Sequence, residues 1–366
     1  MRVIVAGGGI VGLTAAAALG RAGADVVVCE QAPEIRAVGA SIGLWQNALD
    51  VFEGIGIGDR VREIGTTLST WFYDAAGNGH RAPGFGAEDH TFQLVPRPQL
   101  NDLLANAADR RMIRLATRVV GFEETPEAVT VRFADGTSES ADLLVGADGV
   151  YSLVREGLVP GFPAQEHVGH HAWRGTVPTQ GEPAEGSVLT VGDLRTRGGF
   201  TRAYGGQVVW MVNQFDCAPL TGTFKDQALA RAAHLTDGEW NTALAELIKA
   251  TPDEAILHNQ IMFVPPLPRW TSDRVVLIGD AAHGLSPHIS AGGTLGVEDV
   301  GVLVRALDAQ PDLRSALKAY ETDRMPRYET VRELSLAVEN AADAREYAEH
   351  YAAFSHWMLT EAPGAQ

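Results

Sequence analysis

The stretch Arg-Val-Ile-Val-Ala-Gly-Gly-Gly-Ile-Val-Gly, residues 2–12, decides the fold of this chain. It begins with a short apolar run of the length of a buried strand. Gly7, Gly9 and Gly12 follow at the spacing Gly-x-Gly-x-x-Gly. The first glycine permits a tight turn, the second lets a pyrophosphate approach the backbone, and the third lets helix and strand pack closely. Residues 13–19 then read as an alanine-rich helix, whose amino terminus offers free N–H groups to phosphates.

The residues that follow favour a dinucleotide-binding unit. Residues 25–29 form a second apolar run that ends on Glu30, and a carboxylate at this distance from the glycines accepts hydrogen bonds from a ribose. A lone glycine triplet is a weak signal, but here strand, glycines, helix, second strand and acid arrive in order. The alternative, an ordinary strand–turn–helix with small residues for packing, explains fewer of these features.

Composition limits the partners of the protein. The chain has 366 residues, which suffices for one large core or two, and a net charge of −17. This charge argues against nucleic acid and against anionic membrane surfaces as partners. No apolar run has membrane-spanning length, and the chain begins with a strand rather than a signal peptide, so we expect a cytoplasmic protein.

Cysteine and histidine give no sign of a metal site. Cys29 lies in an expected central strand and reads as a buried filler, and Cys217 has no partner pattern. His167, His170 and His171 cluster, but neighbouring strand residues point to opposite faces, so His170 and His171 cannot easily bind one metal ion. We therefore predict no bound metal.

The remaining chain alternates between two kinds of pattern. Residues 141–147 and 274–278 are apolar runs typical of buried parallel strands. Residues 168–263 show mostly short alternating segments, interrupted by a helical pattern at 239–250, and predict an antiparallel sheet. From residue 316 the chain reads as helix, with a break or kink expected at Pro326.

Three separated motifs now resemble one family. The first is the glycine fingerprint, the second is Asp148-Gly149 with Ser152 and Arg155, and the third begins at Gly279-Asp280. Further matching residues are Arg97, Leu100, Ala281, Ala282, His283, Pro287, Gly292, Glu298, Asp299, Tyr320, Arg324, Pro326 and Arg327. In this order and spacing they resemble the group A FAD-dependent aromatic hydroxylases, typified by para-hydroxybenzoate hydroxylase. Residues 38–47 are also similar to the branch that holds urate and salicylate hydroxylases.

The resemblance implies an α/β fold, with a Rossmann-type FAD-binding domain, an inserted antiparallel-sheet substrate domain and C-terminal helices. The implied FAD-binding domain is discontinuous and comprises residues 1–67, 94–163 and 272–312. The implied substrate domain comprises residues 68–93 and 164–271, and residues 313–366 form the C-terminal helical segment.

The resemblance also assigns the cofactor site. The implied FAD-binding residues are Gly7, Gly9, Gly12, Glu30, Arg36, Arg97, Asp148, Asp280, Gly292, Gly293 and Thr294. Among them Asp148 would serve FAD and the nicotinamide together, with Arg155 bracing its loop, and the helix that begins near Gly292 would point its amino terminus at the flavin. We expect structural rather than catalytic roles for Arg155, Tyr320, Arg324 and Arg327. For His283, a packing or hydrogen-bonding role is expected at least as much as a role in the chemistry.

The sequence departs from the family pattern at two places. The family usually has glycine, glutamine, glycine, any residue and asparagine where this chain has Ser290, Ala291, Gly292, Gly293 and Thr294. The backbone role can survive this change, although the position of the flavin is affected. Many relatives carry a basic residue where this chain has Gln31.

Substrate contacts are expected from two regions. Pro287 and His288 adjoin the reacting edge of the flavin in the resemblance, and His288 is the favoured substrate contact. Arg202 and Tyr204 share one face of an expected strand and can offer a charge and a phenol to an acidic aromatic compound. Trp173-Arg174 and Trp210 are further candidates. The alternative places both tryptophans in the core and Arg202 in solvent. His170 or His171 could act as a base toward the substrate, or each could be an ordinary polar strand residue.

The implied reaction uses FAD as the cofactor, NADH or NADPH as a transient co-substrate, and O2. A flavin C4a-hydroperoxide would hydroxylate a small aromatic or heteroaromatic substrate. We expect a monomer or a homodimer. Two alternatives remain open at this point. One is epoxidation, Baeyer–Villiger insertion or ring opening of a polyketide, alkaloid or antibiotic. The other is a flavin-holding binding protein without oxygenation; a plain NAD dehydrogenase leaves the second and third motifs unexplained.

Overall fold

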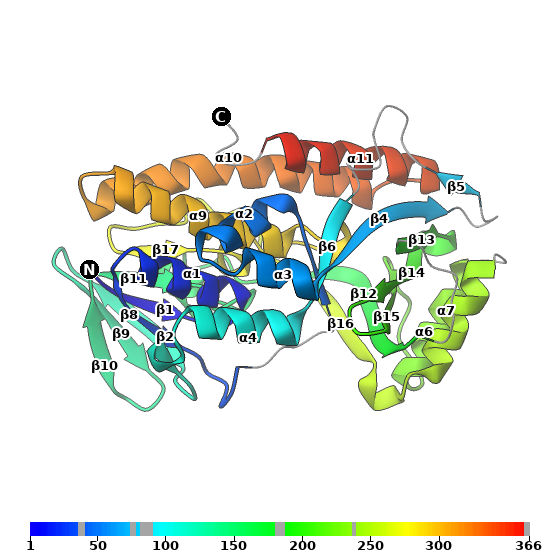
Figure 1. Cartoon of the computed structure of the whole chain (residues 1–366), viewed down its shortest axis with the longest axis horizontal. Coiled ribbons are helices and arrows are strands. Elements are labelled where there is room, and N and C mark those ends of the chain that lie inside the picture. Colours follow the sequence, from blue (N-terminus) through cyan, green and yellow to red (C-terminus); the bar gives the residue numbers. More distant parts are fainter. Residues whose placement is uncertain (36–40, 74–77, 81–90, 180–186, 236–238, 362–366) are drawn as a thin grey trace.

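A five-stranded parallel sheet organises the amino-terminal part of the protein (Figure 1). The computed structural model describes residues 1–35, 41–73, 78–80, 91–179, 187–235 and 239–361. The sheet has the order β17-β11-β1-β2-β7, with bounds Val275–Leu277, Leu143–Gly146, Arg2–Ala6, Asp25–Cys29 and Ile113–Arg114. Numbered one to five along the chain and taken from the β7 edge, the strands have the order 3-2-1-4-5, which is the doubly wound arrangement. In such sheets ligands bind where the strand order reverses, here between β1 and β11.

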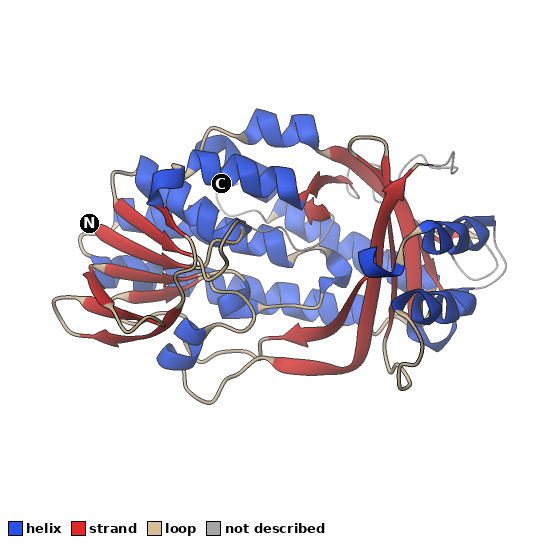
Figure 2. Ribbon diagram, turned by 90° about the horizontal axis from the view of Figure 1, so that it is seen from below, coloured by secondary structure: helices blue, strands red, loops and turns tan. Residues whose placement is uncertain are grey.

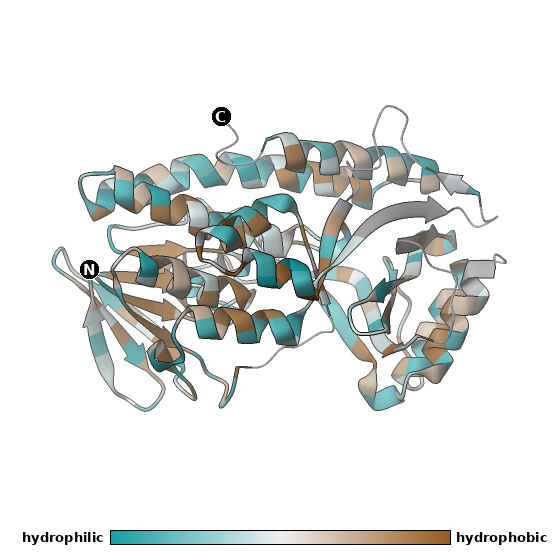
Figure 3. Ribbon diagram, viewed as in Figure 1, coloured by the Kyte–Doolittle hydropathy of each residue, from teal (hydrophilic) through white to brown (hydrophobic). Residues whose placement is uncertain are grey.

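Helices cover this sheet and bury its strands almost completely. They are α1 (Ile10–Arg21), α2 (Gln46–Gly54), α3 (Gly58–Ile64), α4 (Arg97–Ala107), α5 (Leu153–Leu158), α8 (Asp280–His283) and α9 (Gly292–Ala309). The three central strands, β11, β1 and β2, are hydrophobic except at the ends where β1 and β2 begin, as strands buried on both faces must be (Figure 3). Cys29 belongs to this core, as its sequence context predicted. A small antiparallel sheet of β8 (Val119–Glu124), β9 (Val129–Phe133) and β10 (Ser138–Ala141) packs beside it.

A second, largely antiparallel sheet forms the other half of the molecule (Figure 2). Its order is β16-β12-β15-β14-β13-β4-β6-β3, with β5 paired to β4. The bounds are Leu257–Phe263, Gln165–Pro178, Gln207–Gln214, Thr196–Ala203, Ser187–Val191, Thr66–Tyr73, Thr91–Pro96, Ser41–Leu44 and, for β5, Gly79–His80. Strand β3 belongs to this sheet although its sequence lies within the expected FAD-binding segment, so the sheet reaches into that segment.

Two helices cover one face of the large sheet. They are α6 (Phe224–Ala232) and α7 (Glu239–Ala250) (Figure 1). We call this the outer face; its apolar side chains include Trp173, Phe200 and Trp210. Helix α6 was not expected from the sequence, although Thr223 and Asp226 form a capping box at its start, which is a recognised signal.

The opposite face of the large sheet turns toward the half that holds the parallel sheet, and we call it the inner face. It comprises the side chains of His170, Ala172, Arg174 and Thr176 on β12, Arg197 and Thr201 on β14, and Val209, Met211 and Asn213 on β15. These residues alternate along each strand with those of the outer face.

Two long helices, α10 (Leu313–Glu339) and α11 (Ala344–Thr360), run along both halves (Figure 1). Pro326 lies inside α10, so the predicted break does not occur: the helix continues on both sides of it. Tyr347, Tyr351 and Phe354 of α11 join Trp45 in a separate apolar cluster. In the part of the chain that the structure describes, no helix is both long and apolar enough to cross a membrane.

Candidate active site

The carboxyl ends of the parallel strands bring the predicted cofactor residues together. Gly7 follows β1, Glu30 follows β2, Asp148 lies just after β11, and Asp280 lies just after β17. All four strands point the same way, so these residues meet at one edge of the sheet. Residues more than 270 positions apart therefore surround one place, as the sequence motifs implied.

The glycine fingerprint has the shape that a pyrophosphate requires. A Cβ atom on Gly7 would lie 2.3 Å from the carbonyl oxygen of Ala147, and one on Gly12 would lie 2.0 Å from that of Gly7. A Cβ on Gly9 would meet nothing within 4 Å. Gly7 and Gly12 thus allow tight backbone contact, while Gly9 faces open space at the amino terminus of α1. No side chain caps this terminus, which leaves its N–H groups for an anion.

Glu30 is held in place by the backbone around the fingerprint. Its two carboxylate oxygens accept hydrogen bonds from the N–H groups of Gly8 and Ala32, both at 2.7 Å. Each carboxylate oxygen has a second lone pair, so the side chain can still accept a hydrogen bond from a ribose hydroxyl. The geometry fits the predicted role of Glu30.

Arg97 and Asp280 lie close enough to influence each other electrostatically. Burial lowers the pKa of Arg97, and the nearby Asp280 carboxylate raises it. Burial likewise raises the pKa of Asp280, against the opposing effects of His283 and Arg97. The Asp280 side chain nevertheless keeps solvent-accessible surface. Asp280 is therefore surrounded by protein but still accessible, as expected for a carboxylate that lines a ligand site.

The amino terminus of α9 closes the site beside Asp280. A Cβ on Gly292 would lie 3.6 Å from a carboxylate oxygen of Asp280, and one on Gly293 would lie 2.5 Å from Ile42. Ser290 has φ of 53°, a left-handed conformation that favours glycine, at a position where the family usually has glycine. The backbone path therefore survives the substitution. Thr294 accepts a hydrogen bond from the backbone N–H of Trp45 at 3.1 Å, so it joins α9 to the start of α2.

Asp148 caps the start of α5. Its carboxylate accepts hydrogen bonds from Ser152 Oγ and from the N–H groups of Leu153 and Val154. The residue keeps some exposed surface, so the predicted contact with a cofactor stays a prediction beside this capping role. Arg155 donates to three backbone carbonyls, among them that of Ala281 at 3.0 Å, and so braces the loop as the resemblance implied.

Buried ion pairs lock α9 and α10 to the site. Asp299 accepts hydrogen bonds from the N–H of Gly279 at 2.8 Å and from Arg324 Nε at 2.7 Å, and pairs with His283 Nε2 at 2.6 Å. His283 and Arg324 hold the pKa of Asp299 down, to about 2, although burial alone would raise it. Arg327 binds Glu298 in the same way. The structural assignments of His283, Arg324 and Arg327 agree with these contacts.

The inner face carries an unusual set of buried polar atoms. Five side chains contain nitrogen or oxygen atoms that are buried and lack a hydrogen-bond partner among the described residues: His170 Nε2, Arg174 Nε, Thr176 Oγ1, Arg197 Nε and Nη1, and Asn213 Oδ1. Such atoms are rare in proteins, and each requires an explanation, of which a missing ligand or water is the usual one. The inner face is therefore the candidate substrate surface.

Arg197 was missed in the sequence. It is 1% exposed, and its Nη2 donates to the carbonyls of Val338 and Glu339 at the end of α10. Its guanidinium lies 4.9 Å from the ring centre of Phe215 and 4.5 Å from that of Tyr347. Burial lowers the pKa of Arg197. A desolvated guanidinium between two aromatic rings is suited to an acceptor group on a flat ligand.

Arg202 and Tyr204 do not lie with the other predicted substrate residues. Arg202 is an even-numbered residue of β14, like Phe200, and so belongs to the outer face, away from Pro287 and His288. Tyr204 follows the end of the strand and is 45% exposed. The structure thus places Arg202 as the alternative interpretation of the sequence did, at the exposed surface, and substrate contact by either residue stays a prediction without structural support. Trp173 and Trp210 are core residues, as the alternative interpretation of the sequence predicted.

Pro287 and His288 lie in a short turn, Pro287–Ile289, between α8 and α9. His288 is buried, with Nδ1 bonded to Ser286 Oγ at 2.9 Å and Nε2 to the carbonyl of Ser335 at 3.0 Å. Burial, foremost, lowers the pKa of His288 to about 3. Since both nitrogens are engaged within the protein, the structure does not support His288 as a direct hydrogen-bonding contact of the substrate.

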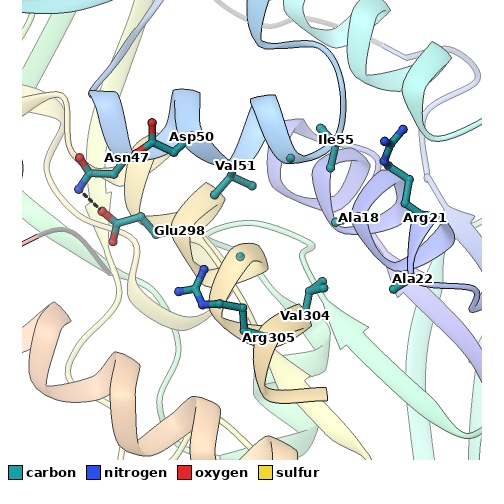
Figure 4. A pocket seen from close by; sticks show the side chains of 12 residues that line it. Ala18, Arg21, Ala22, Asn47, Asp50, Val51, Ile55, Glu298, Val304 and Arg305 are labelled. Atoms are coloured by element: carbon teal, nitrogen blue, oxygen red, sulfur yellow. Dashed lines mark hydrogen bonds between the residues drawn. The ribbon is translucent and has the colours of Figure 1, made fainter. Parts of the chain in front are cut away.

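Arg36, predicted to bind the cofactor, lies outside the described residues. No cluster of metal-binding side chains occurs within the ranges that the structure describes. A separate groove of about 400 Å³ lies between α1, α2 and α9, where Asn47 donates to Glu298 at 2.6 Å (Figure 4). Its arginines, Arg21 and Arg305, are both exposed, so this groove is a surface feature rather than part of the site.

Fold and site together define a flavoprotein of the aromatic hydroxylase type, and comparison with known proteins agrees. The FAD_binding_3 model, described as an FAD binding domain, matches residues 1–335, and the chain belongs to this family, among the group A aromatic hydroxylases. It is 31% identical to an FAD-dependent urate hydroxylase of Klebsiella pneumoniae, over 94% of this chain and 90% of the relative.

Two further relatives extend the comparison. An aurachin C monooxygenase/isomerase of Stigmatella aurantiaca is 31% identical over 89% of this chain and 86% of the relative. The crystal structure of Klebsiella pneumoniae HpxO complexed with FAD and uric acid superposes with a TM-score of 0.80 at 26% identity, covering 97% of this chain and 92% of that one. The predicted fold class is thereby confirmed.

Proposed function

We propose that this protein is an FAD-dependent monooxygenase that uses NADH or NADPH and O2 to hydroxylate a small, polar aromatic or heteroaromatic compound. Membership in the family supports the reaction class. The observation that supports the substrate class is the inner face, whose buried polar atoms of Arg174, Thr176, Arg197 and Asn213 lack partners among the described residues. A flat ring with several oxygen or nitrogen substituents would satisfy them, whereas a plain hydrocarbon would leave them unpaired at a cost.

The proposed cofactor residues divide the work along the FAD molecule. The amino terminus of α1 beside Gly9 would bind the pyrophosphate, and Glu30 the adenosine ribose. Asp280 and Arg97 would bind the ribityl region, and the amino terminus of α9 at Gly292 would face the flavin ring, where its partial positive charge stabilises a reduced, anionic ring. Bound FAD supplies the electron transfer and oxygen activation that side chains cannot provide.

The chain's own residues bind and orient the substrate. Arg197 would attract a carboxylate, a ring oxygen or a deprotonated hydroxyl, because a buried guanidinium gains most from an anionic partner. The rings of Phe215 and Tyr347, against which Arg197 lies, would exclude water around that contact. Arg174, whose pKa is lowered by burial and by the nearby Arg97, brings a second positive charge between the sheet and the cofactor site.

We extend the proposal to domain organisation. Residues 1–67, 94–163 and 272–312 would bind FAD, residues 68–93 and 164–271 would bind the substrate, and the helices of residues 313–366 would join the two parts. The interface between the parts contains Arg97, Asp280 and the inner face. This arrangement suits a monomer or a homodimer equally, because each protomer would contain a whole site.

A second candidate is oxygenation of a polyketide, alkaloid or antibiotic. The similarity to the aurachin C monooxygenase/isomerase, at 31% identity over 89% of the chain, favours it as the runner-up. The two candidates share cofactor and co-substrates and differ in the compound that accelerates nicotinamide oxidation.

The test is NADH and NADPH oxidation by the purified, FAD-loaded protein. The compounds are urate, 6-hydroxynicotinate, 3-amino-4-hydroxybenzoate and aurachin C, with product masses recorded. We expect one of the first three compounds to accelerate oxidation and to gain about 16 Da, the mass of one oxygen atom. The same gain on aurachin C alone would favour the second candidate. Tight binding without oxidation or mass gain would contradict both and indicate a binding protein.

A further inference from the structure

A buried chain of hydrogen bonds crosses from the inner face to the turn that contains Pro287. Nδ1 of His170, on β12, lies 3.4 Å from Ser286 Oγ. Ser286 Oγ lies 2.9 Å from His288 Nδ1, and His288 Nε2 lies 3.0 Å from the carbonyl oxygen of Ser335 on α10. The exposed fractions of His170, Ser286 and His288 are 0%, 6% and 8%. Side chains from three parts of the chain thus form one continuous path.

The direction of each bond follows from the last acceptor. A backbone carbonyl only accepts, so His288 carries its proton on Nε2 and its Nδ1 is an acceptor. Ser286 must then donate to His288, and its oxygen accepts from Nδ1–H of His170. The lone pair that remains is on His170 Nε2, which is buried and has no partner among the described residues. The chain therefore leaves one unused proton acceptor, and this acceptor belongs to the inner face.

The surroundings keep both imidazoles neutral, which this arrangement requires. His170 stacks on Phe215 with ring centres 3.8 Å apart, and His167 contacts it edge-on at 4.9 Å. Burial, foremost, lowers the pKa of His170 to about 2, and the neighbouring His167, His288, Arg197 and Arg195 act in the same direction. The anionic group on this side, Glu339, is paired with His167 at 2.6 Å.

A cavity on the far side of Ser286 connects the chain with solvent. It has a volume of about 410 Å³, and Ser286, Ser335, His167 and Glu339 are among its lining residues. Its wall includes Val168, which is 81% exposed, so the cavity opens at the surface. Ser286 therefore touches His170 on one side and water-accessible space on the other.

We propose that His170 accepts the proton of a ring hydroxyl or ring N–H of the substrate, and that Ser286 passes a proton on to water in this cavity. The inference rests on the proposed function. As the substrate O–H or N–H bond breaks, a bond forms at His170 Nε2 and the proton on His170 Nδ1 moves to Ser286 Oγ. Ser286 releases its own proton to water, so the substrate becomes an anion and one proton leaves. Reversal of these transfers protonates the product and restores the starting tautomer.

This assignment differs from what the sequence suggested. His288 was the favoured substrate contact there, but both of its nitrogens are engaged. His170 was only one of two histidines that could act as a base. His171, its neighbour, points to the outer face and contacts His258 at 3.1 Å. The two adjacent histidines therefore provide a test residue and a matched control.

The hydrogen-bond chain can be tested without a substrate. Long-range 1H–15N spectra of FAD-loaded protein labelled at its 11 histidines distinguish the two tautomers of each ring, with His170→Asn and His288→Asn giving the assignments. We expect the Nδ1–H form for His170 and the Nε2–H form for His288 at pH 7. Ser286→Ala should shift His170 toward the Nε2–H form that predominates in water. His170 in the Nε2–H form in the unaltered protein would overturn the proposal.

The proton transfer is tested by kinetics with whichever of urate and 6-hydroxynicotinate accelerates NADH or NADPH oxidation. His170→Asn keeps a donor near the position of Nδ1 but removes the base. We expect its kcat at pH 7 to fall by about 100-fold or more, a typical contribution of a positioned base. The rate should then rise about tenfold per pH unit as the substrate ionises in solution, whereas that of the unaltered enzyme stays nearly flat. His171→Asn should stay within about twofold.

The two proposals fail in different ways. If neither compound accelerates oxidation by the unaltered protein, the proposed substrate class is contradicted, and the tautomer spectra still decide the hydrogen-bond chain. If the unaltered protein is active and His170→Asn keeps its kcat and its pH profile, the role of His170 is overturned while the proposed function stands.

Discussion

The two faces of the large sheet are built from the same strands but satisfy their polar groups differently. On the outer face, Trp173 Nε1 donates to Gln227 Oε1 at 3.1 Å and Trp210 Nε1 donates to Thr251 Oγ1 at 2.8 Å. On the inner face, Arg197, Asn213 and their neighbours keep buried polar atoms without partners among the described residues. The outer face thus pairs its tryptophan N–H groups within the protein, although Thr196 Oγ1 and Gln214 Oε1 on the same side lack partners among the described residues. The unpartnered atoms of the inner face include those of the Arg197 guanidinium and the His170 imidazole, which a polar ligand could satisfy.

This difference separates stability from function within a few residues of one strand. A face that satisfies its own groups contributes to folding, so its residues are expected to affect the free energy of unfolding. A face with unpartnered groups costs folding free energy and is retained for another reason. Alternate residues along β14 and β15 should therefore give opposite results when changed, and the following predictions test this from the largest expected effect to the smallest.

Trp210→Ala should affect stability most. The side chain is fully buried on the outer face, and its loss leaves a large cavity, so we expect the free energy of unfolding to fall by about 3–5 kcal/mol. Met211→Ala, the next residue but on the inner face, should cost less and change KM for the substrate instead. Urea unfolding and steady-state kinetics measure both. Equal losses of stability would contradict the division into two faces.

Arg197→Met should lower catalysis and, because the bonds from Nη2 to the carbonyls of Val338 and Glu339 are lost, should also cost some stability. A hydrogen bond to a charged group contributes about 1.5–3 kcal/mol, so we expect kcat/KM to fall roughly 10- to 100-fold. The control is Arg202→Met on the outer face, which should leave kcat/KM within about twofold. Circular dichroism and FAD fluorescence verify that both variants are folded and loaded. A larger loss for Arg202→Met would restore the assignment that the sequence favoured.

The buried histidines beside the inner face should make the protein sensitive to acid. Their pKa values are lowered in the folded state, to about 2 for His170 and about 3 for His288, from an unfolded value of about 6.5. Below pH 6.5 the unfolded chain therefore binds protons that the folded chain does not, and the free energy of unfolding falls as pH falls. Each histidine contributes a slope of up to about 1.4 kcal/mol per pH unit.

Urea unfolding of the FAD-loaded protein at pH 7, 6 and 5 measures this slope. His170→Asn should make the dependence on pH shallower. His356→Asn, on the exposed side of α11, should leave it as in the unaltered protein. A slope that stays the same in His170→Asn would mean that His170 is protonated in the folded state.

Two threonines give the smallest effect. Thr251 Oγ1 accepts from Trp210 and donates to the carbonyl of Leu247, both at 2.8 Å, so Thr251→Val should cost about 1–2 kcal/mol of unfolding free energy. Thr176 Oγ1 on the inner face has no partner among the described residues, so Thr176→Val should be neutral or stabilise by about 0.5 kcal/mol. Thermal unfolding compares the two. A destabilising Thr176→Val would show that its hydroxyl is already bonded in the free protein.

The cofactor-binding half of the fold could be predicted from local sequence. Gly12 and Glu30 have roles set by chain neighbours within thirty residues, and backbone geometry leaves few alternatives at such positions. The capping box at Thr223 and Asp226 was an equally local signal that was overlooked. Asp148 shows the limit: its motif was recognised, but its carboxylate caps α5, a use that depends on the exact path of the following turn.

The sequence by itself determined the dinucleotide-binding Rossmann unit and the alternation of residues along each strand, because these follow from spacing and local geometry, while FAD followed from the resemblance of three motifs to one family. Only the tertiary structure decided which of the two alternating sets faces the site. Arg197 and Arg202 lie on opposite faces of one strand, and the helices packed across it make Arg197 the inner residue. Likewise, only the packing of α10 places the carbonyl of Ser335 against His288, 47 positions away, and leaves His170 Nε2 as the free acceptor. Hydrogen bonds between distant segments cannot be read from either segment alone.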